Sequence, residues 1–339
     1  MRGKSKNIGI APCHIGIDLL GSDIPPNELL QEILLCYKEL TPSVTLTLFG
    51  TTVLFEKTRP PAANVFFHAV KEVITMEEAP LTAIRRKKDS SLCIGIRLLK
   101  EGHLHAFISA GNTGALMGCA RLQLPALLHV ERPALLTLLP TRDKEVAVLD
   151  VGANTSYKAK HLIQFAAMGV AYQKSRGVKI PVVGLLNIGS EAKKGTPELQ
   201  KVYNQLLAGT KKSSSSYAFA GNIEGRDVFH GEIDVLVTDG FTGNVFLKTA
   251  EGIAAVILED LENSLLEGCS PHMKGMLAKL RQQLHYAEYP GALLCGVDGI
   301  VIKCHGNSSP QSFIRSITTA ARLVQHSFLD QVRKELKKR

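Results

Sequence analysis

The sequence predicts an α/β protein built on a mostly parallel sheet with helices on both faces. Short β-rich runs alternate with helical stretches along almost the whole chain, and glycines are spread through it. Such alternation is typical of βαβ units. The β-rich runs are also apolar on both faces, which a sheet covered by helices on each side requires.

The expected strands are short runs rich in β-branched and other apolar residues. They are Ile15–Leu19, Val44–Phe49, Asn64–His68, His105–Ser109, Ala134–Leu139, Val146–Asp150, Val182–Asn187, Val235–Thr238 and Gly299–Lys303. The basic start Met1–Asn7, followed by apolar residues, imitates a signal peptide. His14, Asp18 and the prolines interrupt that apolar region, which favours a first strand instead.

Helices are expected between these strands. They are Pro26–Leu40, Ser90–Lys100, Thr113–Leu122, Ala159–Ser175, Thr196–Ala208, Thr242–Leu266 and Ser309–Lys338. Lys211–Ser216 is the clearest loop, and Gly268–Met276 interrupts two late helices. Neither resembles a domain linker, so residues 1–339 are expected to form a single α/β catalytic unit, or two interleaved subdomains with the active cleft between them.

Composition narrows the class of function. The 339 residues carry a net charge of +9, from 40 Lys and Arg against 31 Asp and Glu, which suits an acidic partner. Phosphate, an acidic carrier protein and an anionic membrane remain open. Nucleic acid is disfavoured, because zinc-ligand spacing, a helix-turn-helix pattern and aromatic–basic interleaving are all missing. No apolar stretch approaches the roughly 20 residues that span a bilayer.

The seven cysteines form no CxxC pair, which predicts reduced thiols in the core of a cytoplasmic protein. Cys304 and His305 are adjacent, so a nucleophilic Cys–His pair is one interpretation. Neighbours on a strand point to opposite faces, however, so a structural cysteine is the favoured interpretation.

A Gly-rich turn, Ser109–Gly118, follows one expected strand and opens a helix. Its glycines allow close approach of a ligand, and the free N–H groups of the first helical turn favour an anion. Asn112 or Thr113 can also simply cap the helix. The turn matches neither a Walker A loop nor GxGxxG, so alone it indicates only a tight turn.

Similar loops recur after three further strands. Asp150–Asn154, Asn187–Glu191 and Asp239–Asn244 each combine Gly with Asn. Because the carboxyl ends of parallel strands share one edge of a sheet, we expect all four loops to surround one cleft.

Lysines accompany these loops. Lys193 and Lys194 lie in the loop Ser190–Thr196, and Lys248 is four residues after Asn244, on the same side of the expected helix. A single lysine is usually an exposed charge. Beside Gly-rich helix N-termini, these lysines are candidate phosphate ligands.

Taken together, these segments resemble the phosphate acyltransferases of bacterial phospholipid synthesis, which convert acyl-[acyl carrier protein] and phosphate into acyl phosphate. The matching segments run in the family's order over nearly the whole chain. They are AIRRKKDSS (83–91), FISAGNTGALMG (107–118), LDVGAN (149–154), GLLNIGSEAKKG (184–195), GNIEGRD (221–227), TDGFTGNVFLKTAE (238–251), AEYPGALLCGVDG (287–299) and KCHGNSS (303–309). The N-terminal family pattern, close to DAMGGD, departs here to Asp18-Leu19-Leu20-Gly21-Ser22-Asp23.

The resemblance implies a fold similar to isocitrate dehydrogenase and phosphotransacetylase, a homodimer, and no metal or nucleotide cofactor. It implies acyl carrier protein and inorganic phosphate as partners, with loose attachment of a cytoplasmic protein to an anionic membrane surface. Whether a membrane glycerol-3-phosphate acyltransferase also binds it is left open.

Roles for residues follow from this chemistry. Phosphate is a dianion near neutral pH and needs no base, so the enzyme must bring it to the thioester and stabilise an oxyanion. We expect Lys194 to neutralise phosphate, Asn244 to donate its amide N–H to the thioester oxygen, and Lys248 to add positive field. The residues expected to orient phosphate or the pantetheine arm are Ser109, Gly111, Asn112, Thr113, Gly114, Asn154, Asn187 and Gly243.

Several alternatives stay open. A covalent route is less favoured, since the sequence has no GxSxG elbow. A phosphotransacetylase acting on short acyl-CoA would share the fold and the reaction type. A nicotinamide-dependent dehydrogenase would need a carboxylate cluster for a metal, and only scattered Asp18, Asp23, Asp150 and Asp239 are found. A non-catalytic adaptor would explain the charge but not the four loops.

The late helices carry two apolar stripes. Ile253, Val256, Ile257, Leu261, Leu265 and Leu266 form the first, which we expect to pack in the core or against a second subunit. Met273, Met276, Leu277, Leu280 and Leu284 form the second, among Lys274, Lys279 and Arg281. Its basic polar side suits a helix lying on anionic lipid as well as a dimer contact.

Overall fold

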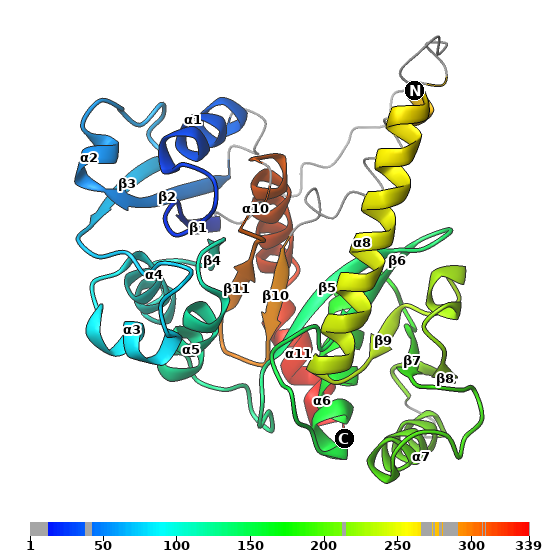
Figure 1. Ribbon diagram of the computed structural model, residues 1–339. Coiled ribbons are helices and arrows are strands. Elements are labelled where there is room, and N and C mark those ends of the chain that lie inside the picture. The colour runs from blue at the N-terminus through cyan, green and yellow to red at the C-terminus, as the bar shows by residue number, and fades with distance from the viewer. Residues whose placement is uncertain are drawn as a thin grey trace, which may run out of the picture.

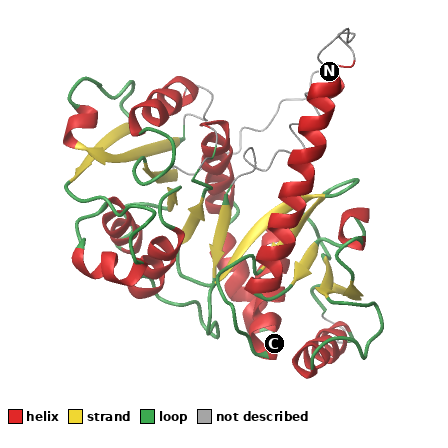
Figure 2. Ribbon diagram, in the orientation of Figure 1, coloured by secondary structure: helices red, strands yellow, loops and turns green. Residues whose placement is uncertain are grey.

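One eleven-stranded sheet organises the chain, in the order β3-β2-β1-β4-β11-β10-β5-β6-β9-β7-β8 (Figure 1). The computed structural model describes residues 13–37, 43–211, 215–265, 291–306 and 310–338, with residues 273, 275–277, 280 and 308. Helices pack on both faces of the sheet (Figure 2). Buried side chains alternate between these faces: Ala106 and Ile108 join one hydrophobic cluster, and Phe107 joins the other. The predicted fold class is therefore confirmed.

The first block of the sheet consists of five parallel strands. They are β3 (Val65–Val70), β2 (Val44–Thr51), β1 (Cys13–Asp18), β4 (Ala106–Ser109) and β11 (Ile300–Lys303). The helices that follow them in the chain are α1 (Pro26–Cys36), α2 (Thr52–Phe55), α3 (Pro80–Arg86), α4 (Ser91–Lys100), α5 (Thr113–Gln123) and α10 (Pro310–Gln325). A Cβ on Gly95 of α4 would lie 2.0 Å from the Phe107 ring, so glycine lets this helix approach the sheet closely.

The second block consists of four strands that are parallel to one another. They are β6 (Glu145–Leu149), β9 (Val235–Val237), β7 (Val182–Leu186) and β8 (Ala218–Ile223). The helices of this part are α6 (Ala159–Ser175), α7 (Pro197–Thr210), α8 (Gly240–Leu265) and α11 (Phe328–Lys337), with a 3₁₀ turn, η2 (Asp227–His230).

Two strands join the blocks by antiparallel pairing. β10 (Ala292–Cys295) pairs antiparallel with β11 and with β5 (Ala134–Pro140), and β5 pairs antiparallel with β6. Three successive reversals make the two blocks run in opposite directions. Their carboxyl ends therefore lie at opposite edges of the sheet, and the expectation that all four Gly-rich loops share one edge is wrong.

Most expected elements are found within a few residues of their predicted bounds. β8, β10, α2 and α3 were not predicted. The expected helix Ser309–Lys338 is two helices, because the chain turns at Ser327, which has a positive φ of 49°. The Lys211–Ser216 loop, the Gly268–Met276 interruption and the second apolar stripe lie partly outside the described residues.

α8 crosses the face of the sheet in front of β5 and β6 (Figure 1). Its Gly240–Asn263 segment has a mean hydropathy of 1.3 and is the single helix, within the described ranges, long and apolar enough to cross a membrane by length and composition. One such helix is weak evidence of a membrane span, and 22% of its apolar window is buried in the structure. α8 also begins inside the candidate site, where its first turns pack against a loop of the second block.

Candidate functional site

The candidate residues fall into two groups at opposite edges of the sheet. We call the first the Asn244 edge: the ends of β6, β9 and β7, with loops 150–154 and 187–195 and the first turns of α8. Leu149, Val237 and Leu185 lie level in these three neighbouring strands. The loops after β6 and β7 therefore emerge on either side of the start of α8.

Asp150 organises the loop after β6. Its carboxylate accepts hydrogen bonds from the backbone N–H groups of Leu135, Gly152, Ala153 and Asn154, at 2.8–3.2 Å, and from the Asn154 side chain at 2.8 Å. Asp150 is fully buried, and burial raises its pKa against the opposing effect of these donors. One carboxylate thus fixes the conformation of the whole loop.

α8 is docked directly onto this loop. The Gly240 N–H donates to the carbonyl of Asn154 at 2.9 Å. A Cβ on Gly243 would lie 1.9 Å from the carbonyl oxygen of Asp150, so no larger residue fits there without movement. The carboxylate of Asp239 accepts from the N–H groups of Phe241 and Thr242, which are among the unpaired donors of the first turn.

Asn244 and Lys194 are both solvent-exposed at this edge. Asn244 Nδ2 donates to the carbonyl of Val151 at 3.0 Å, which holds its side chain over loop 150–154. Lys194 Nζ lies 3.7 Å from Glu191 Oε1. In the described part of the chain no hydrogen bond or ion pair joins Lys194 to Asn244.

Asn187 shapes the loop that carries Lys194. Its Nδ2 donates to the carbonyl of Lys194 at 3.2 Å and to Asn222 Oδ1 at 3.1 Å, and its Oδ1 accepts from the N–H of Ile188. Asn154 acts similarly in its own loop, where its Nδ2 donates to the carbonyl of Pro133 at 2.7 Å. The amides of both residues are committed to holding backbone in place.

The second group is the Lys303 edge: the ends of β1, β4 and β11, with residues 18–23, 109–114 and 303–308. Asp18, Ser109 and Lys303 are neighbours across three adjacent strands. The Ser109 hydroxyl donates to Asp18 Oδ2 at 2.8 Å and accepts from the Gly111 N–H at 3.0 Å. Burial raises the pKa of Asp18 to about 6, against the hydrogen bonds it accepts.

Asn112 anchors the turn that leads into α5. Its Oδ1 accepts from the Ala115 N–H at 3.0 Å, as an N-cap does, and its Nδ2 donates to three carbonyls, those of Thr75, Met76 and Glu78. Asn112 is buried, whereas Thr113 and Gly114, the next two residues, are exposed.

Lys303 is a buried lysine at this edge, only 8% exposed. Its Nζ donates to the carbonyl of Ala110 at 3.1 Å and to that of Cys304. Burial lowers the pKa of Lys303 to about 8, and the positive charge of Lys248 lowers it further against the opposing effect of nearby acidic groups.

Glu251 links α8 to the loop after β11. Its buried carboxylate lies 2.7 Å from Lys248 Nζ and 3.6 Å from His305 Nε2. Lys248 therefore faces the Lys303 edge, although Asn244, one turn earlier, faces the opposite edge of the sheet. α8 spans the two groups, since Gly240 and Glu251 are 11 positions apart and the helix rises roughly 16 Å between them.

The predicted site residues thus divide into two classes. Lys194, Asn244, Lys248, Thr113 and Gly114 are exposed and can meet a substrate. The remaining six are buried and form the framework of the loops: Ser109, Gly111, Asn112, Asn154, Asn187 and Gly243. Sequence reasoning missed the roles of Asp150, Glu251, Lys303 and His305. The position of Asp150 at the end of a strand, before a Gly-rich turn, was the signal available.

Cys304 and His305 point away from each other. Cys304 is fully buried with its Sγ 3.2 Å from Ser316 Oγ of α10, and burial raises the pKa of its thiol. His305 faces Glu251 on α8 instead. The pair cannot act together, which agrees with the structural role expected for the cysteine.

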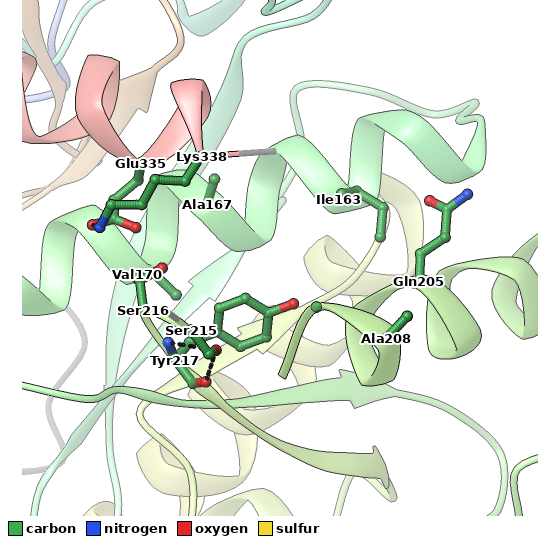
Figure 3. A pocket seen from close by; sticks show the side chains of 11 residues that line it. Ile163, Ala167, Val170, Gln205, Ala208, Ser215, Ser216, Tyr217, Glu335 and Lys338 are labelled. Atoms are coloured by element: carbon green, nitrogen blue, oxygen red, sulfur yellow. Dashed lines mark hydrogen bonds and ion pairs between the residues drawn. The ribbon is translucent and has the colours of Figure 1, made fainter. Parts of the chain in front are cut away.

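A cavity of about 270 Å³ lies between α6, α7 and α11, and no predicted site residue lines it (Figure 3). Ile163, Ala167 and Val170 form an apolar side, and Glu335 and Lys338 a polar one. Tyr217, which lines it, precedes β8, so the cavity lies near the amino ends of the second-block strands. Among the described residues no group of three or more His, Cys, Asp or Glu could hold a metal ion.

Comparisons with known proteins agree with this architecture. A family model described as "Fatty acid synthesis protein" matches residues 13–331. The phosphate acyltransferase of Thermoanaerobacter pseudethanolicus is 38% identical over 329 residues, which cover 95% of this chain and 97% of that protein. The phosphate acyltransferase of Gloeobacter violaceus is 39% identical over 345 residues, covering 99% of each.

Among solved structures, a phosphotransacetylase from Streptococcus pyogenes matches with a TM-score of 0.60 over 92% of this chain and 94% of that one. At 15% identity this shows a common fold alone. The family match and the relatives extend over nearly the whole length, both candidate edges included. The chain therefore belongs to the fatty acid synthesis protein family, and it is an acyltransferase that, like its phosphate acyltransferase relatives, transfers an acyl group to phosphate.

Proposed function

We propose that the acyl donor is a long-chain acyl thioester of acyl carrier protein and that inorganic phosphate attacks it directly, giving acyl phosphate for phosphatidic acid synthesis. The observation that carries this proposal is the arrangement at the Asn244 edge. An amide donor on α8 and a lysine on the neighbouring loop are both exposed there, on either side of β9. These are the two groups that the reaction needs.

Each group has a defined task. The Lys194 ammonium neutralises one charge of the phosphate dianion as it approaches the thioester carbon. A phosphate oxygen forms the new bond to that carbon, and the carbonyl oxygen becomes an oxyanion that accepts a hydrogen bond from Asn244 Nδ2. The tetrahedral intermediate then expels the thiolate of the carrier, which takes a proton from water.

Pre-organisation supports the role of Asn244. In the resting protein its Nδ2 already donates to the carbonyl of Val151, so the amide is oriented before substrate binds. The second amide hydrogen remains for the oxyanion. A fixed donor of this kind costs little reorganisation as charge develops, which is the basis of oxyanion stabilisation.

The basic surface of the protein supports an acidic carrier as the donor. A net charge of +9 favours association with an acidic protein at low ionic strength. The alternative is a phosphotransacetylase that uses a short acyl-CoA, since the fold is common to both classes.

A comparison of donors tests the proposal. Thiol release is measured with saturating phosphate and either palmitoyl carrier protein or acetyl-CoA. We expect kcat/KM at least a hundredfold higher for the carrier thioester. Equal or greater activity with acetyl-CoA would reject the long-chain carrier donor and favour the phosphotransacetylase alternative.

A further inference from the structure

Lys303 carries a buried charge that no carboxylate contacts. Its Nζ donates to two backbone carbonyls, those of Ala110 and Cys304, and among the described residues it forms no ion pair. Removing an ammonium from water has a large free-energy cost, and carbonyl dipoles recover only part of it. An anion beside Lys303 would offset more of this free-energy cost.

The charged groups around Lys303 do not replace such an anion. Asp18 on β1 and Asp23 after it face the lysine, as do the Cys304 thiol and Lys248 on α8. Asp18 already accepts hydrogen bonds from Ser109 and from the Leu20 N–H. Asp23 is exposed, so solvent and salt screen it.

Two further side chains, Lys248 and His305, lie near Lys303. Lys248 is close enough to lower the pKa of Lys303, and both lysines lower the pKa of His305. Burial is the main cause for His305, and Glu251 opposes it. Repulsion of this kind between Lys248, Lys303 and His305 is relieved when an anion binds among them.

The amino end of α5 also favours an anion near Lys303. The carbonyl of Ala110, which Lys303 contacts, immediately precedes the Gly111–Asn112 turn. The eleven-residue helix α5 then begins at Thr113, where exposed N–H groups and the helix dipole favour negative charge.

Lys303 cannot share one phosphate with Lys194. β11 and β7 are five places apart in the sheet, or roughly 24 Å at about 4.8 Å per strand. Their carboxyl ends also lie at opposite edges. A phosphate group of atomic dimensions contacts one lysine or the other, so the molecule has two separate cationic positions, with Asn244 and Lys248 of α8 between them.

We propose that Lys303, together with Lys248 and the amino end of α5, forms a second phosphate-binding position. This inference rests on the proposed function for its ligand. Two phosphate groups take part in that reaction: inorganic phosphate, and the phosphodiester that joins the pantetheine arm to its carrier. Glu251 is a positioning residue there, because it holds both Lys248 and His305 at this edge.

Direct binding tests the proposal without turnover. Calorimetry measures the affinity of inorganic phosphate and, separately, of pantetheine 4′-phosphate for the wild-type chain and for Lys303→Met. One probe should bind the variant at least tenfold more weakly, roughly the effect of one lost charge-assisted hydrogen bond. The probe that weakens identifies which phosphate group the position holds.

Lys174→Met is the matched control. Lys174 is also largely buried, but its Nζ lies 2.8 Å from Glu335 of α11, a residue that belongs to neither edge as defined above. The Lys174→Met variant should bind both probes with the affinity of the wild type. If Lys303→Met binds both probes normally, the proposal is wrong, whatever the enzyme's acyl donor proves to be.

A second variant covers the case in which Lys303→Met does not fold. Lys248→Gln changes an exposed residue of α8 and keeps a donor for Glu251. It should weaken the same single probe by about threefold or more, as expected for a partly exposed charge. Unchanged affinity for both probes would then overturn the proposal.

Discussion

At the scale of single residues, the site depends on a division between side chains that hold loops and side chains that can meet substrate. The side chains that form hydrogen bonds to the backbone of their own or neighbouring loops are those of Asp150, Ser109, Asn112, Asn154 and Asn187. The exposed groups that remain at the Asn244 edge are few. Substitution of a residue that holds a loop should therefore lower both activity and stability. Substitution of an exposed residue should lower activity alone.

Lys194→Ala and Asn244→Ala test the second class. Each should lower kcat at least a hundredfold, because loss of one oxyanion donor or charge partner costs about 3–4 kcal/mol of transition-state stabilisation. The free energy of unfolding should change by less than about 0.5 kcal/mol, since both side chains are exposed. Normal turnover in either well-folded variant would remove that residue from the mechanism.

Asp150→Ala tests the first class. Removing the carboxylate leaves the buried N–H groups of Leu135 and Asn154, and the partly buried one of Ala153, without their acceptor. Unsatisfied buried donors cost about 1–3 kcal/mol each, so we expect a loss of at least about 2 kcal/mol in the free energy of unfolding. Urea denaturation measures it, and a loss below 1 kcal/mol would show that Asp150 does not organise the loop.

Asp18 makes stability depend on pH. Its pKa is raised to about 6 in the folded chain, so the folded state holds the proton more tightly than the unfolded state does. The resulting stabilisation is fully present below about pH 3.8 and is lost as pH rises through about 6, with a magnitude of up to about 3 kcal/mol.

Asp18→Asn should remove that dependence. We expect the free energy of unfolding of the wild type, relative to this variant, to fall between pH 4 and pH 7. Other carboxyls, Asp150 among them, are common to both proteins and cancel in the difference. Parallel curves over this range would contradict a buried, proton-binding Asp18.

At the scale of elements, hydrophobic patterns predicted most strands and helices but not their direction. β5 was predicted as an ordinary apolar strand, and β10 was not predicted. Their antiparallel pairing reverses the direction of the second block relative to the first. Strand periodicity is the same in either direction, so no local pattern carries that information. The two-edge site, and the burial of Lys303, depend on this long-range pairing and could not be predicted.

α8 carries an exposed apolar stripe that the core does not cover. Ile253, Val256 and Ile257 are 58%, 59% and 46% exposed, so the core half of the prediction for this stripe is wrong for these three residues. Packing of this stripe against a second subunit stays a prediction. Val256→Asp should convert the proposed dimer to monomers in light scattering, and a dimer of unchanged mass would exclude this stripe from the interface.

The second apolar stripe is expected to lie on membrane. Met273 and Met276 are exposed, and Lys274, Lys279, Arg281 and Leu284 lie outside the described residues. Met276→Asp or Leu280→Asp should weaken salt-sensitive binding to anionic vesicles in a flotation assay while the dimer persists. Monomers in place of dimers would assign this segment to the subunit interface instead.

At the scale of the whole molecule, α8 connects two opposed halves of one sheet. Its first residue donates a hydrogen bond to the loop at the Asn244 edge, and Glu251, about three turns later, contacts His305 at the Lys303 edge. A substrate pair with two phosphate groups and a thioester fits such a bipartite arrangement. The resemblance to phosphate acyltransferases could be seen in the sequence, because its motifs are the loops at these strand ends.

Transfer of an acyl group from carrier protein to inorganic phosphate by this chain can be followed by ³¹P NMR of a reaction with palmitoyl carrier protein. The proposed function predicts an acyl phosphate signal that grows in step with thiol release, requires inorganic phosphate, and is unchanged by EDTA. Thiol release that continues at the same rate without phosphate, or that leaves the phosphate signal unaltered, would contradict it.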